Sequence, residues 1–370
     1  MSKELEYKIR GGILLYEIKK VKNEKYITIN GFKEDFESKN LNIPAEIDGI
    51  KVKEIGINAF CCVEISSLTL PEGLVVIKES AFDCCDELKK VVFPTSLRVI
   101  EDEAFSGCNS LTTVKFNEGL EYIEDSAFSY TNIQKLVLPN SLIEIGESAF
   151  ECCDFESIAF GSKLKIIGER AFADNPALKN IKFNEGLEKI GDEAFFECGV
   201  ESVILPDSLS SMSFDAFNGC TCLKNFHIGK NFTNNDYVTT LLFNCPELEK
   251  ITISPSNRQF KVIDGFLYDM NIKELVRTPS NIKKLTIPKW VESVSPDCFF
   301  EVYPDRVIIK AESIENIYDS CLDDIESIIC VPGSEVEEWA LDRGIKVKPY
   351  VSLLNDFVES LTDEGLEIND

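Results

Sequence analysis

The sequence is poor in the residue types that active sites most often use. It contains one histidine, two tryptophans and three methionines among 370 residues. A single histidine leaves no basis for a histidine-rich metal centre. The sequence also has no phosphate-binding glycine-rich loop and no nucleophile elbow. We therefore expect a protein that is not an enzyme, with no catalytic residue, no metal ligands and no cofactor.

Basic charge and long apolar runs are also scarce. The 38 lysines and arginines are outnumbered by 64 acidic residues, which gives a net charge of -26. Nucleic-acid binding requires a positive surface, so we expect no nucleic-acid partner. A transmembrane helix needs about 18 or more consecutive apolar residues, and no run approaches that length. We therefore expect no membrane insertion.

The first residues do not resemble an export signal. Charged side chains, among them Lys3, Glu4 and Arg10, precede a short apolar run at residues 13–15. That run is too short to form the apolar core of a signal peptide. The expectation from this segment is a chain without a signal peptide, and therefore a cytoplasmic location by default.

The sequence is rich in an internal repeat. The pair Ala-Phe recurs at intervals of 22 or 23 residues, with its phenylalanine at Phe60, Phe82, Phe105, Phe128, Phe150, Phe172, Phe195 and Phe217. Short alternating runs such as residues 68–70 and 136–138 keep the same period, and an apolar pair such as Leu74 and Ile77 follows. Alternation indicates a strand with one buried face. The period predicts one solenoid, in which each coil supplies a strand and an inward phenylalanine.

The corners of the repeat resemble a known family. Residues 145–150 form Ile-Gly-Glu-Ser-Ala-Phe and residues 190–195 form Ile-Gly-Asp-Glu-Ala-Phe. With the strand before each corner and the cysteine after it, this pattern is similar to BspA-like, Treponema-type leucine-rich repeats over about residues 41–300. The lead-in at 43–52 and a hairpin at 262–268 resemble the same family. The resemblance implies a β-rich repeat solenoid, a right-handed leucine-rich-repeat coil with short parallel strands and strand-rich caps.

These signals divide the chain into four parts. We expect an N-terminal strand-rich cap at 1–42 and a leucine-rich-repeat solenoid at 43–300 with a hairpin insertion at about 256–280. A C-terminal cap should follow at 301–350, with a short helix that Ser334 caps. Residues 351–370 form an acidic tail.

Several of the 14 cysteines follow the repeat. Five of them stand three residues after a repeat phenylalanine, and Thr131 and Asn175 fill the same slot elsewhere: Cys85, Cys108, Cys153, Cys198 and Cys220. One small side chain per coil predicts a packing ladder of free thiols. Adjacent pairs such as Cys61 and Cys62 do not have zinc-ligand spacing. A chain rich in free thiols favours a reducing compartment.

Charge is distributed unevenly over the repeat. The outward strand positions hold many lysines with apolar neighbours, and we take ten of these residues as a candidate binding face: Lys89, Lys90, Lys115, Lys135, Lys179, Lys182, Lys224, Val92, Val137 and Ile204. The acids in equivalent places are Glu156, Glu201 and Glu249, whereas the corners before Ala-Phe are strongly acidic. Two interpretations stay open. The lysines either keep the sheet soluble or attract an acidic partner.

The family resemblance implies a binding role. Its members are similar to surface proteins of anaerobic bacteria that engage host molecules. We therefore expect a non-enzymatic bacterial protein that binds a protein or glycoprotein through its extended sheet, in adhesion or host interaction at the cell surface or after secretion. The missing leader and the free thiols favour an alternative, an intracellular protein–protein interaction scaffold. His227, at an outward strand position, is expected to be an ordinary surface residue.

Overall fold

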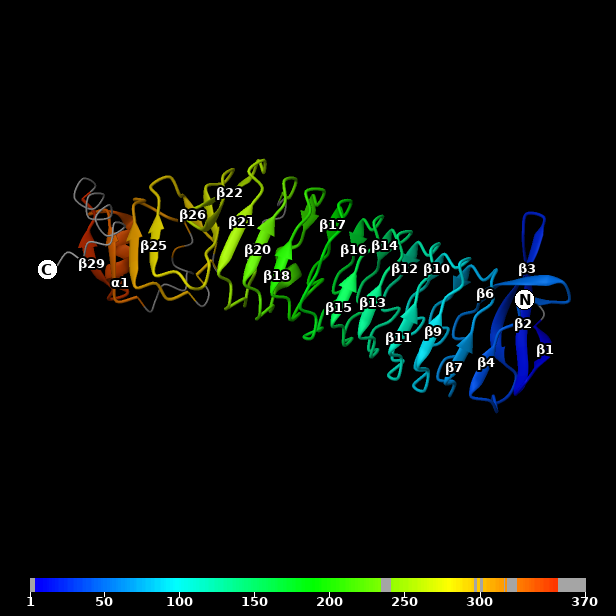
Figure 1. The fold of residues 1–370 in the computed structure, drawn as a ribbon. Helices are drawn as coiled ribbons and strands as arrows, with labels where there is room; N and C mark the ends of the chain where they lie inside the picture. The colour runs from blue at the N-terminus through cyan, green and yellow to red at the C-terminus, as the bar shows by residue number, and fades with distance from the viewer. Residues whose placement is uncertain are drawn as a thin grey trace.

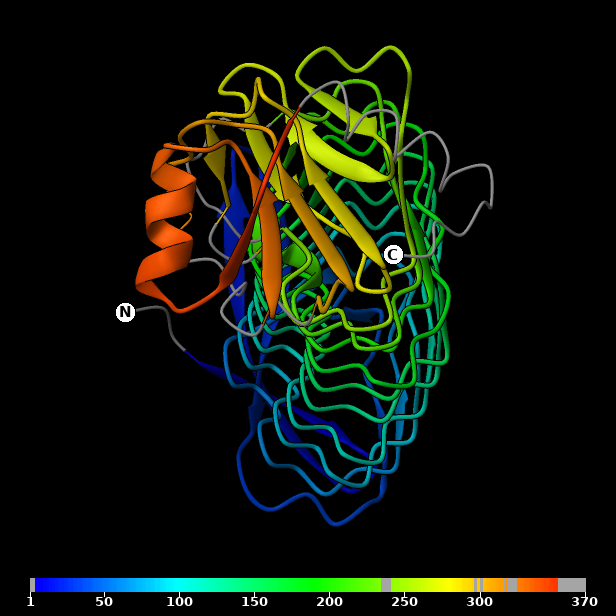
Figure 2. The same cartoon turned by 90° about the vertical axis from the view of Figure 1, so that its left-hand side faces the viewer.

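The computed structural model describes residues 4–233, 241–295, 298–299, 302–315, 317 and 325–351. The described chain forms an elongated β-solenoid, with an antiparallel N-terminal sheet at one end and the helix α1 (Glu335–Asp342) near the other (Figure 1). Seen from the end, successive coils nest on one another (Figure 2). Apart from Val351, the expected acidic tail at 351–370 lies outside the described residues.

A series of short parallel strands, paired in three groups, corresponds to the strands expected from the sequence. Its members are β4 (Asn40–Asn42), β7 (Ser67–Thr69), β9 (Lys90–Val92), β11 (Thr113–Lys115), β13 (Lys135–Val137), β15 (Ser157–Ala159), β18 (Ser202–Ile204), β20 (Asn225–Ile228) and β21 (Lys250–Ile253). Asn180 bridges the gap between β15 and β18 through isolated pairings with Ser157 and Ser202. Central residues such as Val91 and Leu136 are buried, and the residues on either side of them are exposed. We call this series the first ladder.

A second ladder, which the sequence did not reveal, lies across the core from the first. It runs through β6 (Ile50–Ile55), β8 (Val76–Ile77), β10 (Val99–Ile100), β12 (Tyr122–Ile123), β14 (Glu144–Ile145), β16 (Ile166–Ile167), β17 (Lys189–Ile190) and β19 (Ser211–Met212). At these positions the sequence predicted only an apolar pair and no strand. Two-residue strands are too short for alternation to indicate a strand.

The N-terminal segment closes the first coil. The strands β1 (Leu5–Ile9), β2 (Gly12–Val21) and β3 (Glu24–Phe32) form an antiparallel sheet, and β3 then pairs in parallel with β6. The short β5 (Glu46–Ile47) pairs with β6 as well. The sheet therefore continues the second ladder and covers core residues such as Ile55 that would otherwise meet solvent.

A phenylalanine spine fills the interior, as the repeat predicted. The eight repeat phenylalanines are fully buried. Consecutive rings stack with their centroids 5.1 to 5.4 Å apart. Stacked aromatic rings add specific contact energy to the burial of their large apolar area. The spine thus joins each coil to the next.

The cysteine ladder lies beside this spine. The predicted ladder cysteines are buried, and each thiol donates a hydrogen bond to the backbone of the preceding coil. The Cys108 Sγ lies 3.2 Å from the Phe82 oxygen, and the Cys198 Sγ lies 3.1 Å from the Phe172 oxygen. Asn175, in the same slot, donates to the Phe150 oxygen at 3.0 Å. The slot therefore requires a small donor that reaches a carbonyl.

The repeat is interrupted after β21. A sheet of β22 (Phe260–Ile263), β23 (Phe266–Asp269), β24 (Glu274–Arg277) and β26 (Ser293–Val294) contains the expected hairpin, and a 3-10 helix η1 (Phe214–Phe217) precedes it in the chain. A further parallel ladder follows: β25 (Lys284–Ile287), β27 (Arg306–Ile309), β28 (Ser327–Cys330) and β29 (Lys346–Pro349). The buried hydrophobic residues form two clusters, and the boundary between them lies near the hairpin.

The C-terminal segment combines ladder strands with the expected helix. The Ser334 hydroxyl accepts a hydrogen bond from the Glu337 backbone N–H at 3.2 Å, as an N-cap does. Strands β27 to β29 run through residues 301–350, where the sequence predicted a cap. The segment thus extends the parallel pairing while α1 buries Val336 and Trp339 against the end of the core.

Candidate binding face

The outward side chains of the first ladder form an exposed, largely basic surface, which we call the ladder face. All ten residues that the sequence suggested are exposed on it: Lys89, Lys90, Lys115, Lys135, Lys179, Lys182, Lys224, Val92, Val137 and Ile204. Val137 is 70% exposed and Ile204 is 65% exposed, so the surface also offers large apolar side chains. The fold therefore brings these residues onto one side of the molecule.

The strand register fixes the order of residues on the ladder face. Lys115 lies beside Val92, Val137 beside Ala159, and Ile204 beside His227. Paired strands are about 4.8 Å apart, so side chains at equivalent positions lie in a row along the solenoid. Both apolar and basic side chains occur along it. A partner that lies across the row would meet both kinds of contact.

The lysines of the ladder face are not neutralised by neighbouring acids. Among the described residues, none of its seven lysines forms a salt bridge. Glu156 and Glu201 occupy the positions equivalent to Lys179 on the coils before and after it. The positive charge is therefore densest around β9 and β11, where Lys89, Lys90 and Lys115 have no acid in the equivalent places.

A shallow hollow ends the row at β20 and β21. It has a volume of about 240 Å³, and its lining includes Ile204, His227, Lys250 and Thr252. The His227 Nδ1 and the Thr252 Oγ1 are 2.9 Å apart. His227 is half-buried on the open strand surface. The histidine thus lines a surface depression on the ladder face.

The second ladder presents a surface of opposite charge. A groove of about 460 Å³ crosses β14, β16, β17 and β19. Its floor is formed by Gly146, Gly168 and Gly191, and its lining carries five acids and one lysine: Asp125, Glu144, Glu147, Glu169, Asp192 and Lys189. Acids from four of the acidic corners expected from the sequence therefore lie along one groove, on the sheet opposite the ladder face.

The glycines of this groove are explained by coil stacking. A Cβ atom at Gly168 would lie 2.6 Å from the carbonyl carbon of Gly146, and one at Gly191 would lie 2.6 Å from the carbonyl carbon of Gly168. Real Cβ atoms do not approach non-bonded atoms that closely. The groove floor is thus a consequence of backbones that pack directly on one another.

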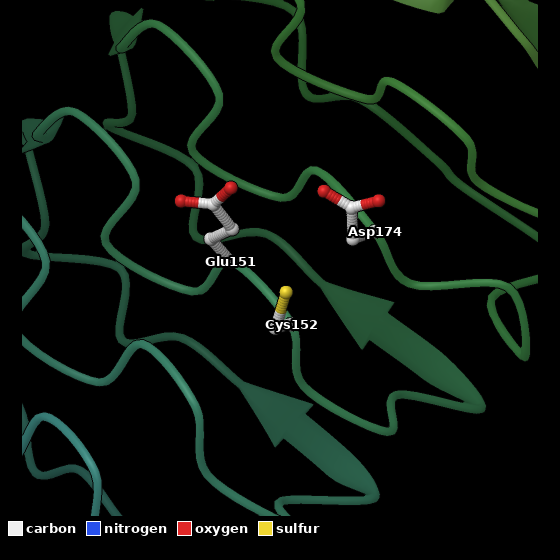
Figure 3. Close-up of side chains that lie close together, drawn as sticks. All are labelled: Glu151, Cys152 and Asp174. Atoms are coloured by element: carbon white, nitrogen blue, oxygen red, sulfur yellow. The ribbon is translucent and has the colours of Figure 1, made fainter.

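One compact group of metal-ligand types lies at the Ala-Phe corners. Glu151, Cys152 and Asp174 place their ligand atoms within 4.8 Å of one another on adjacent coils (Figure 3). The Arg170 guanidinium already joins the two carboxylates, at 2.6 Å from Glu151 and 2.9 Å from Asp174. It also pairs with Glu193. The protein's own cation therefore balances this acidic group.

Sequence reasoning missed the groove and the three-residue group. The repeat period could have indicated both, because residues that are 22 or 23 positions apart in the sequence become neighbours on adjacent coils. Glu151 and Asp174 are 23 residues apart, and Gly146 and Gly168 are 22 apart. The sequence therefore places these residues at neighbouring positions once they are ordered by coil.

Comparison with known proteins identifies the class of protein. A model described as the BspA type leucine rich repeat region matches residues 25–154, 143–263 and 270–335 in six copies. The chain therefore belongs to the BspA-type leucine-rich-repeat family. Within the described residues, no helix has the length and apolar character needed to cross a membrane.

Solved structures from several bacteria are similar. A leucine-rich repeat protein from Bacteroides ovatus is 21% identical with a TM-score of 0.58, over 91% of this chain and 98% of that chain. The Treponema pallidum leucine rich repeat protein is 26% identical with a TM-score of 0.43, over 59% and 91%. A leucine rich cell surface protein from Faecalibacterium prausnitzii is 18% identical with a TM-score of 0.47, over 84% and 72%. The first of these shows the same fold. No curated protein matches the chain.

Proposed function

We propose that this chain is a non-enzymatic binding protein whose ladder face contacts an acidic protein or glycoprotein. The observation that carries the proposal is the segregation of charge. Seven exposed lysines without salt-bridge partners among the described residues lie on one sheet of a protein whose net charge is -26. A solenoid offers an extended surface suited to such contacts.

The exposed apolar side chains favour binding over mere solubility. Lysine alone would keep an exposed sheet soluble. Val92, Val137 and Ile204 have the opposite effect, since they expose apolar area at 43%, 70% and 65%. Apolar anchors within a charged rim are typical of protein interfaces. We therefore favour contact with a macromolecule, and we propose adhesion or host interaction as the setting.

An intracellular scaffold is the second candidate. None of the cysteines in the described part of the chain forms a disulfide, which is typical of proteins in reducing compartments. The same ladder face would then bind a partner inside the bacterium. The two candidates share a surface and differ in the source of the partner.

Binding to mucin, an acidic glycoprotein, tests the proposal. The wild type is compared with a face variant that carries Lys89→Glu, Lys90→Glu and Lys115→Glu. A matched control carries Lys51→Glu, Lys163→Glu and Lys189→Glu, three exposed lysines away from the ladder face that form no salt bridge among the described residues. Both variants change the net charge equally, so only the location of the charge differs.

The outcomes separate the candidates. Mucin binding by the wild type and the control, with loss in the face variant, would support an adhesin that acts through the ladder face. Face-dependent capture of a protein from bacterial lysate, with no mucin binding, would favour the scaffold. Equal binding by all three proteins would reject the ladder face as the contact surface.

A further inference from the structure

The strand β1 forms a free edge of the largest sheet. It stands at the end of a 12-stranded sheet that continues through the second ladder, and β2 is its neighbour there. It lies at the N-terminal end of the solenoid (Figure 1). Within the described residues, no strand pairs with its outer side. Such an edge presents backbone N–H and C=O groups that can pair with another strand.

The register with β2 shows which backbone groups face the free edge. Ile9 and Gly12 pair directly across a two-residue turn, so they exchange backbone hydrogen bonds. Bonded and non-bonded pairs alternate along an antiparallel ladder, so Tyr7 also bonds to β2. The backbone N–H and C=O groups of Glu6 and Lys8 therefore point away from β2, towards the free edge.

We propose that β1 pairs antiparallel with β1 of a second copy of this chain, about a two-fold axis at Tyr7. The chain around this residue reads Glu-Leu-Glu-Tyr-Lys-Ile-Arg. Reversal of the segment places Glu6 opposite Lys8 of the second copy. It likewise places Glu4 opposite Arg10. Opposite charges across a strand pair stabilise the pairing, whereas like charges destabilise it.

The apolar face of β1 matches in the same register. Leu5 comes to lie opposite Ile9 of the second copy, and the two Tyr7 side chains meet at the axis. These three residues are half-buried against the core, so part of their area is still open to solvent. Glu6 and Lys8 are exposed on the other face. Each position of the strand therefore meets either an apolar residue or an opposite charge.

Other registers match less well. A shift of the pairing by one residue would bring charged side chains opposite apolar ones, because successive side chains point to opposite faces. An axis at Glu6 or at Lys8 would bring that residue opposite its own copy, which opposes like charges. The same holds at Leu5, where Glu4 would meet Glu6. The axis at Tyr7 is thus selected by charge.

The local charge permits two copies to approach at this end. Copies of a protein whose net charge is -26 repel each other. Residues 4–40, however, carry eight basic and seven acidic side chains, so the acidic excess lies elsewhere in the chain. Lys33 lies 2.8 Å from the Glu6 Oε1, and a carboxylate can accept from a second lysine through its other oxygen. This salt bridge is therefore compatible with the proposed pairing.

The proposed dimer joins two solenoids end to end through one continuous sheet. A two-fold contact uses the same surface on both copies, so assembly stops at two. A strand of five residues buries less area than a standard protein interface. We therefore expect reversible association that depends on concentration.

The test measures the mass of the full chain by sedimentation equilibrium over a range of concentrations, and its shape by X-ray scattering. We expect a monomer–dimer equilibrium, with a maximum dimension for the dimer that is nearly twice that of the monomer. A dimer in which the ladder face of one copy covers the acidic groove of the other would instead be thicker and much shorter.

Charge variants of β1 locate the contact. Lys8→Glu should weaken dimerisation by at least about tenfold, because two opposite-charge pairs become like-charge pairs. The swap of Glu6→Lys with Lys8→Glu restores opposite charges in the same register and should dimerise nearly as well as the wild type. Lys20→Glu is the matched control. It makes the same change in net charge at an exposed position of β2, which is paired on both sides.

A backbone variant tests strand pairing independently of charge. Lys8→Pro removes an N–H that faces the free edge and leaves the groups that bond to β2, a position where strands tolerate proline. It should abolish dimerisation. Lys8→Ala removes the same charge but keeps the N–H, so it should still dimerise, more weakly than the wild type.

Three results would overturn the proposal. One is a monomeric mass for the folded wild type at every concentration. Another is a dimer that persists equally in Lys8→Glu and Lys8→Pro, or one whose shape is compact. The third is equal loss of the dimer in Lys8→Glu and in the charge swap, which would show that charge does not set the register. Circular dichroism spectra of every variant verify that the fold persists.

Discussion

At the residue scale, each coil position has its own physical requirement. The spine position takes a phenylalanine because stacked rings fill the space between the two ladders. The slot three residues later takes Cys, Thr or Asn because a short donor must reach a spine carbonyl. Outward strand positions have no such requirement, and they hold lysine, serine or valine. The residue type therefore varies between coils mainly at exposed positions, where a partner can contact the side chains.

The spine predicts a large effect for Phe128→Ala. This ring is fully buried between Phe105 and Phe150, with centroid distances of 5.3 and 5.4 Å. Truncation should lower the free energy of unfolding by about 3–5 kcal/mol, because a cavity replaces the stacked ring. Urea denaturation measures the change. Tyr130→Ala, at a site that is 56% exposed, is the control and should have little effect.

The cysteine ladder predicts a loss of stability at alkaline pH. Burial raises the pKa of Cys153 and of Cys198 to about 12, from 9.0 for an unperturbed thiol. The folded state therefore keeps these protons while the unfolded state loses them. Their contribution to stability is complete below pH 9 and is lost as the pH rises towards 12, by at most about 1.4 kcal/mol per pH unit for each thiol.

A double variant isolates this contribution. Cys153→Ala with Cys198→Ala should be less stable than the wild type at pH 7.5, because two buried hydrogen bonds are lost. The difference should narrow at pH 10.5, measured by urea denaturation under reducing conditions. The exposed Cys222→Ala should show the same difference at both pH values. A pH-independent difference for the double variant would contradict the argument.

At the element scale, the sequence predicted strands only where alternation was long enough to be seen. Residues such as Lys135–Val137 place a buried leucine between two exposed side chains, and the first ladder follows from that pattern. Pairs such as Val99–Ile100 contain a single inward residue, so they resemble any apolar pair. Their strand character arises from pairing with the coils on either side, a non-local effect that local pattern does not contain.

Part of the candidate site could likewise be predicted from the sequence, and part could not. The ladder face could be listed by residue from the sequence because its positions keep the period. The groove and the group of Glu151, Cys152 and Asp174 could not be recognised from adjacent residues alone. Each depends on contacts between coils, such as that of Glu151 with Arg170, and on the direction of the side chains at the corner. Side-chain direction at an irregular corner is not set by period.

The tight stacking of the second ladder predicts that Gly168→Ala is destabilising. The added Cβ would lie 2.6 Å from the carbonyl carbon of Gly146, in a backbone that cannot move away without shifting a whole coil. We expect a cost of about 1–3 kcal/mol in the free energy of unfolding, from overpacking. The control is Ser213→Ala, at the equivalent position two coils on, where a Cβ is already accommodated. Thermal denaturation of the two variants should therefore diverge.

At the scale of the whole molecule, the two ladders separate charge across the solenoid. Lysines such as Lys115 and Lys182 project from the first ladder, while acids such as Glu169 and Asp192 line the groove on the second. The acids of the groove repel an acidic partner, whereas the lysines of the first ladder attract it. Such a partner therefore has one favourable direction of approach. Such steering weakens as salt screens it, over about 10 Å at 0.1 M ionic strength. A partner bound through the ladder face should therefore dissociate at high salt.

The modular stacking of coils predicts that one whole coil can be removed. Deletion of residues 129–150 joins Phe128 to Glu151, which occupies the coil position of Ser129. Each remaining coil keeps a neighbour on both sides, so the fold should persist at somewhat lower stability. The far-UV circular dichroism per residue should be unchanged, and the maximum dimension from X-ray scattering should shrink by about 5 Å.

A half-coil deletion provides the contrast. Removal of residues 129–139 shifts every later coil out of register, so that spine phenylalanines such as Phe150 no longer stack on Phe128. We expect that variant to lose cooperative unfolding and to expose apolar surface. Equal disruption by the two deletions would mean that the coils are not interchangeable units, and that stability instead depends on particular contacts within coil 129–150. Cooperative unfolding of the whole-coil deletion alone would establish that the coil is the unit of this fold.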